Sequence, residues 1–132
     1  MKFFLAVLSF VVISFALAFP WHMIWFHDQY VAWGAFTRKE PIMVLGLFAM
    51  VTQGIVIAYL FPKLQGDRHP VVEGVFYSLV LGLLVYTVMG PATAAKFQIE
   101  PVASFLATHT IFQILQFTLT GVALGLIYGK RT

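Results

Sequence analysis

Long apolar runs separated by short polar segments dominate the pattern of this sequence. Each of four runs can cross a membrane as a helix, since a helix rises about 1.5 Å per residue and the hydrocarbon core is about 30 Å thick. We expect these helices at about 3–26, 41–61, 72–89 and 101–128. The pattern therefore predicts an all-α fold, an integral membrane four-helix bundle with short loops, in which residues 1–132 form a single transmembrane domain.

The first apolar run is open to two interpretations. Lys2, the apolar residues after it and Ala16-Leu17-Ala18 have the form of a secretory signal peptide with a small-residue cleavage site. Extended to Phe26, the same run is long enough for a transmembrane helix with a kink at Pro20. We expect the membrane helix, with removal of residues 1–18 as the alternative.

Prolines and aromatic residues mark the next boundaries. Residues 21–40 contain all three tryptophans, which favour membrane interfaces, and we expect a connecting loop there. Pro41 suits the first position of the second helix, because its missing N–H has no partner at that point. Pro62 is expected to end the same helix.

The fourth run carries two contrasting faces. At about 100° per residue, four polar residues fall on one helical face: His109, Gln113, Gln116 and Thr120. Small residues follow on roughly the opposite face, and a similar line runs along the third helix: Gly121, Gly125 and Gly129, then Gly74, Ser78 and Gly82. Small residues allow helix backbones to approach closely. Both faces of the fourth helix are therefore expected to touch protein, and the small residues to pack helices within a protomer or between copies.

Composition narrows the class of protein. The chain is 61% hydrophobic and 10% charged, with a mean hydropathy of +0.91. A soluble domain needs more charge on its surface, and a disordered chain has fewer aromatic residues than the 17% found here. Cysteine is absent, which excludes disulfides, thiolate metal sites and cysteine nucleophiles.

Basic residues set the expected topology. The net charge is +3, but the basic residues lie scattered at helix ends, so we expect no nucleic-acid partner. One side of the membrane receives five of them and the other side three: Lys2, Lys63, Arg68, Lys130 and Arg131 against Arg38, Lys39 and Lys96. The side with more positive charge is expected to be cytoplasmic, which places both termini inside.

Few residues offer chemistry. His109 is the strongest candidate, because ionisable residues inside membrane helices are rare and often mark functional sites. With His22 and His27 it could bind a metal or a haem, although their spacing matches no metal motif. The simpler interpretation is interhelical hydrogen bonding, including an amide pair between Gln53 and Gln113, which lie at equal depth. We expect no cofactor and identify no catalytic residue.

Three stretches carry a resemblance: Phe19 to Asp28 (FPWHMIWFHD), Gln53-Gly54-Ile55-Val56 and Ala94-Ala95-Lys96. With them the chain resembles small bacterial four-helix integral membrane proteins from families of unknown function. The resemblance implies a compact bundle in the bacterial inner membrane, surrounded by membrane lipids, and implies no activity.

Three functions remain open. The first is an accessory or packing subunit of a membrane assembly, which suits the lack of catalytic motifs. The second is a small homo-oligomeric transporter or channel, with a cavity lined by Gln53, His109, Gln113, Gln116 and Thr120. The third is a membrane protein that binds a metal or cofactor through histidine. The expected partners are other membrane subunits or further copies of the chain.

Overall fold

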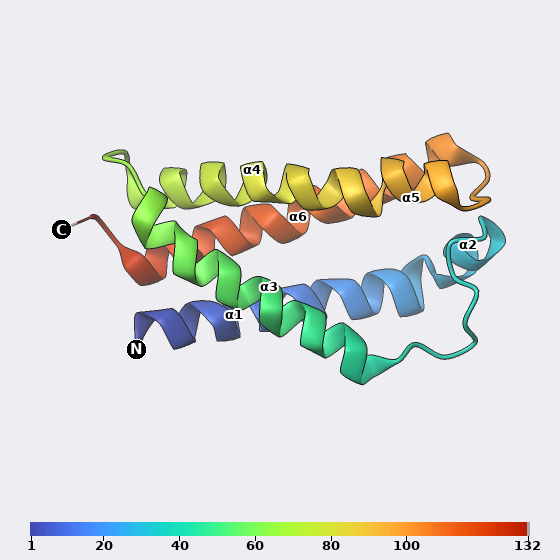
Figure 1. Ribbon diagram of the computed structural model, residues 1–132, viewed down its shortest axis with the longest axis horizontal. Helices are drawn as coiled ribbons and strands as arrows, with labels where there is room; N and C mark the ends of the chain where they lie inside the picture. The colour runs from blue at the N-terminus through green and yellow to red at the C-terminus, as the bar shows by residue number, and fades with distance from the viewer. Residues whose placement is uncertain (132) are drawn as a thin grey trace.

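The computed structural model describes residues 1–131, which form helices and connecting segments without a strand. In chain order the elements are α1 (Lys2–Phe19), the π-helical η1 (Pro20–Trp25), α2 (His27–Ala32), α3 (Met43–Leu64), α4 (Pro70–Met89), α5 (Pro91–Lys96) and α6 (Val102–Tyr128). Four helical stretches are long and apolar enough to cross a membrane: Lys2–Trp25, Met43–Leu64, Pro70–Lys96 and Val102–Tyr128. The expected all-α membrane bundle is confirmed (Figure 1).

The segment after Pro20 is helical to Trp25, which agrees with the expected first helix over 3–26 and corrects the expected loop over residues 21–40. Proline has no N–H to donate, and the chain responds by widening into η1 rather than ending the helix. The Phe26 N–H then bonds the Trp21 carbonyl oxygen at 3.0 Å, five residues back. The short helix α2 follows, so most of the non-helical connection to α3 is the stretch 33–42.

Pro62 does not end α3, which continues to Leu64. A proline inside a helix leaves the carbonyl four residues earlier without its partner, and lipid offers no replacement. Here the Tyr128 hydroxyl donates to that carbonyl, on Ala58, at 2.8 Å. The Tyr77 hydroxyl donates to the preceding carbonyl, on Ile57, at 2.9 Å. Tyr128 of α6 therefore satisfies the carbonyl that the proline leaves free, and Tyr77 of α4 adds a second bond to the neighbouring carbonyl.

Glycines bring α4 and α6 into backbone contact. A Cβ atom at Gly125 would lie 2.5 Å from the Pro70 carbonyl oxygen, and one at Gly74 would overlap the Gly121 carbonyl. Ser78 is fully buried between these helices, and a Cβ at Gly82 would lie 2.6 Å from the Phe117 ring. We call this contact the glycine seam: Gly74, Ser78 and Gly82 of α4 with Gly121 and Gly125 of α6. Small residues at these positions allow the two backbones to approach this closely.

Gly129 has a different role from the one its spacing indicated. It lies past the end of α6 with φ +69°, and no atom of residues 1–131 lies within 4 Å of the place where its Cβ would be. That backbone conformation favours glycine at a helix end. Gly129 therefore terminates α6 and does not pack helices in the protomer.

The helix α6 is the most central of the four long helices. It packs along α4 and also contacts α1, whereas α3 packs mainly on α1, which it crosses obliquely (Figure 1). One apolar cluster, around Phe10, Phe61 and Phe117, lies toward the termini. A second, around Tyr30 and Phe112, lies toward η1 and α2.

Polar contacts join the two ends of the chain. The Lys2 ammonium donates to the Tyr128 carbonyl oxygen at 2.9 Å. The Gln65 amide donates to the Gly129 carbonyl at 2.6 Å, and Arg131 donates to the Gln65 carbonyl at 3.1 Å. Both termini therefore lie at one end of the bundle (Figure 1).

Candidate functional site

The four polar residues of α6 lie inside the protein. His109, Gln113 and Gln116 are each less than one-tenth exposed, and Thr120 is 1% exposed. The residues of the glycine seam on the same helix face α4 and are buried as well. Both faces of α6 therefore touch protein, as their patterns predicted.

The half of this polar stripe nearer the termini is satisfied within the bundle. The Gln116 amide donates to the Ser14 hydroxyl of α1 at 2.8 Å, and Ser14 is fully buried. The Thr120 hydroxyl donates to the Gln116 backbone carbonyl at 2.8 Å. Ser14 is not recognisable from the sequence, because a single serine in an apolar run gives no signal until its partner on α6 is known. The hydrogen bond between Gln116 and Ser14 therefore links α1 to α6.

The other half of the stripe has unsatisfied atoms. The Gln113 amide nitrogen lies 3.5 Å from His109 Nε2. Because an amide NH₂ only donates, His109 must accept through Nε2 and carry its proton on Nδ1. That Nδ1 and the Gln113 carbonyl oxygen are both buried and have no hydrogen-bond partner in residues 1–131. The His109 N–H donor and the Gln113 carbonyl acceptor are therefore both unpaired at this level of the bundle.

Aromatic rings surround His109 and His22 at this level. Phe112 packs on both histidines, with ring centroids 4.6 Å from His22 and 6.0 Å from His109. Phe105 stacks on His109 at 5.7 Å. His22 also packs on Tyr30 at 5.0 Å. The two histidines therefore belong to one aromatic cluster near the end of the bundle opposite the termini.

Tyr30 adds a buried hydroxyl to this cluster. The side chain is 1% exposed, and burial raises the pKa of Tyr30, which a hydrogen bond from Trp21 partly offsets. The geometry of that contact is poor, since neither the Trp21 indole nitrogen nor the Tyr30 oxygen has a well-formed hydrogen bond within residues 1–131. Tyr30 stays protonated at neutral pH and is available as a donor.

The structure does not unite the three histidines proposed for a metal. His27 begins α2, and its nearest charged group is the exposed Asp28, 3.4 Å away. The widened η1 directs His22 inward, whereas His27 lies beyond its end. Within the described residues no group of three side chains from His, Cys, Asp or Glu could hold a metal ion.

The expected amide pair does not form. Gln113 contacts His109, and Gln53 makes no side-chain hydrogen bond within residues 1–131. Gln53 is partly exposed at the middle of α3. Its depth matches that of Gln113, but α3 crosses α1 and runs apart from α6 over most of its length.

Glu73 is a second buried polar residue that the sequence analysis missed. It is 7% exposed, and its carboxylate lies 3.4 Å from Arg68 Nε. The Arg68 backbone N–H also donates to it at 3.3 Å. These contacts order the turn before α4, so Glu73 serves the fold at the end where the termini lie. Its place three residues after Pro70 was the available signal.

The protein is therefore a packed helical bundle. At the end opposite the termini, aromatic rings surround buried polar atoms that lack hydrogen bonds. Comparisons with protein-family models, curated proteins and solved structures find no match for this chain.

Proposed function

We propose that this protein is an accessory subunit of a larger membrane assembly and that it contacts its partner through α3. Gln53 is the observation that carries the proposal. Its amide lies at the middle of a membrane-crossing helix, is partly exposed and makes no side-chain hydrogen bond within residues 1–131. A polar amide that is fully exposed to lipid without a hydrogen bond costs about 2–7 kcal/mol. A polar group on a partner helix removes that penalty.

The packing of α3 supports the same conclusion. This helix rests mainly on α1, and most of its circumference is open: Val44 is 80% exposed, Phe48 67% and Tyr59 56%. Apolar side chains alone suit lipid as well as protein. The partly exposed amide among them favours protein, because interhelical hydrogen bonds hold membrane helices together.

The buried stripe of α6 favours packing over transport. A water-filled path through one protomer needs polar residues that line open space. His109, Gln113 and Gln116 are instead buried, and Gln116 is bonded to Ser14. A path built between copies is the alternative, and it requires the chain to assemble with itself.

Native mass spectrometry of the protein extracted gently from its own membrane tests the proposal. We expect a complex that contains a different polypeptide. Gln53→Leu should weaken that complex, whereas Thr52→Val should not, because the Thr52 hydroxyl already donates to the Phe48 carbonyl at 2.8 Å. A complex made only of copies of this chain would overturn the accessory role and direct attention to flux assays.

We further infer a location in the bacterial inner membrane with both termini in the cytoplasm. Contacts between Lys2 and Tyr128, and between Arg131 and Gln65, gather the basic-rich segments at one end of the bundle. The segment with Arg38 and Lys39 meets the other end, where the Glu100 N–H donates to the Trp33 carbonyl at 3.0 Å. The end with more positive charge is the one that membrane insertion retains in the cytoplasm.

The absence of cysteine makes this topology simple to test. A single cysteine replacing Lys39 should react in intact cells with a thiol reagent that cannot cross the membrane. A cysteine replacing Lys130 should react only after the membrane is opened. The reverse pattern would refute the orientation.

A further inference from the structure

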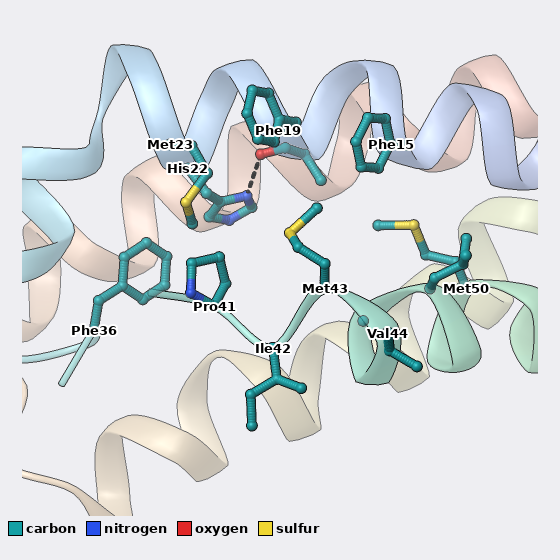
Figure 2. Close-up of a pocket in the computed structure, with 13 residues that line it drawn as sticks. Phe15, Phe19, His22, Met23, Phe36, Pro41, Ile42, Met43, Val44 and Met50 are labelled. Atoms are coloured by element: carbon teal, nitrogen blue, oxygen red, sulfur yellow. Dashed lines mark hydrogen bonds between the residues drawn. The ribbon is translucent and has the colours of Figure 1, made fainter. Parts of the chain in front are cut away.

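A cavity separates the start of α3 from α1 and η1. Its volume is about 440 Å³, within the range of small-molecule sites, about 300–1,000 Å³. Phe19, His22 and Met23 lie on one wall, and Met43 and Met50 lie across from them (Figure 2). The cavity is distinct from the polar stripe of α6, none of whose residues lines it.

The cavity opens toward the membrane. Phe15, Phe19 and Met43 contribute to its lining, and they are 43%, 40% and 46% exposed. All three belong to helices that cross the membrane or begin to do so. A molecule dissolved in lipid can therefore enter sideways between α1 and α3. None of the 13 lining residues is Asp, Glu, Lys or Arg, so the wall itself is uncharged and suits a neutral ligand. Arg38 and Lys39 line an adjoining pocket rather than this one.

His22 supplies a hydrogen-bond acceptor to this apolar space. Its Nδ1 lies 2.9 Å from the Ala18 carbonyl oxygen, drawn as the dashed line in Figure 2. A carbonyl only accepts, so Nδ1 must carry the proton and Nε2 the lone pair. Nε2 has no hydrogen-bond partner in residues 1–131. It is also not one of the fully buried, unpaired polar atoms, so a ligand can reach it. Nε2 therefore offers an acceptor to a ligand that carries a hydrogen-bond donor.

The other lining residues favour an aromatic donor. Met23, Met43 and Met50 place three thioethers around the cavity, and thioethers make favourable contacts with aromatic rings. The Phe15 and Phe19 rings, which also belong to the lining, stack on each other with centroids 5.6 Å apart. An aromatic ring with a hydroxyl group satisfies the methionines, the phenylalanines and His22 together.

We propose that this cavity binds a neutral, lipid-soluble phenol whose hydroxyl donates to His22 Nε2. The ring lies among the methionines, and an apolar tail leaves through the opening into the bilayer. The proposal is independent of the accessory role, because Gln53 does not line the cavity.

Photoaffinity labelling of the full-length protein in lipid nanodiscs provides the test. The probe is a 4-alkylphenol with a diazirine in its alkyl chain, competed by three unlabelled ligands. These are the 4-alkylphenol itself, its methyl ether and a fatty alcohol of equal length. We expect labels in peptides that contain Phe19 or Met43. The phenol should compete about tenfold better than the ether, which lacks the donor.

Two variants and one control complete the experiment. His22→Phe keeps a ring for packing and removes the acceptor, so phenol affinity should fall about tenfold, to that of the ether. Met43→Trp fills the cavity from the opposite wall and should abolish labelling. This variant tests the site even if His22→Phe fails to fold. His69→Phe, exposed at the other end of the bundle, should change nothing.

Three results would overturn the assignment. Equal competition by phenol and ether would remove the role of His22. Labelling that persists in Met43→Trp would place the ligand elsewhere. A fatty alcohol that competes as well as the phenol would show that the ring is not recognised.

Discussion

Replacing Gly125 of the glycine seam with alanine should lower the free energy of unfolding. A Cβ atom at Gly125 would lie 2.5 Å from the Pro70 carbonyl oxygen, 2.5 Å from Val71 Cα and 2.7 Å from the Pro70 carbonyl carbon. All three are backbone atoms and cannot rotate away. Because carbon contacts are optimal at about 3.5–4.0 Å, Gly125→Ala must push α4 and α6 apart by about 1 Å. Overpacking of this kind typically costs about 1–3 kcal/mol.

The chain offers a matched control in Gly46→Ala. Among the described residues, no atom lies within 4 Å of a Cβ at Gly46, which is also helical. Alanine favours a helix over glycine by about 0.5–1 kcal/mol, and this gain is common to both variants. The free energy of unfolding of Gly125→Ala should therefore lie about 1–3 kcal/mol below that of Gly46→Ala.

Equilibrium unfolding in mixed micelles with increasing dodecyl sulfate, followed by tryptophan fluorescence, measures the difference. Equal stability of the two alanine variants would show that α4 and α6 do not meet backbone to backbone. The reasoning from the seam would then be wrong.

Three further expectations concern buried polar groups, each measured as the free energy of unfolding in micelles. Ser14→Ala should lower it by about 1 kcal/mol by leaving the Gln116 amide unpaired, and adding Gln116→Leu should recover most of that loss. Tyr128→Phe should cost about 1 kcal/mol by exposing the carbonyl that Pro62 leaves free, and adding Pro62→Ala should rescue it by restoring an N–H donor. For Tyr30, whose pKa is raised on folding above 10.0, the stabilising effect is present below about pH 10 and lost as pH rises through the folded-state pKa. Alkaline destabilisation that persists unchanged in Tyr30→Phe would contradict this.

Much of the fold follows from local patterns in the sequence. Apolar runs give the four long helices because only a helix satisfies its backbone within the bilayer. The spacing of Gly74, Gly121 and Gly125 indicated close packing, since it depends only on helix periodicity. The same periodicity placed His109 and Gln116 on one buried face.

The failures share a different cause, which is dependence on distant residues. Pro62 stays inside α3 because a tyrosine far along the chain, Tyr128, bonds the carbonyl that it disturbs. Gln53 and Gln113 agree in depth but not in position, since depth along a helix says nothing about how helices cross. The partner of Gln116 was equally hidden, because Ser14 lies on another helix.

The glycine seam also bears on how the protein moves. Backbone contact through Gly74, Gly121 and Gly125 leaves α4 and α6 no room to slide, so their halves nearest the termini should behave as one rigid body. The opposite end is closed by aromatic packing, with unpaired atoms on Trp21 and His109. Opening motions should therefore pivot at the seam and widen toward η1 and α2. In hydrogen–deuterium exchange, the amides of η1 and α2 should exchange long before those along the seam.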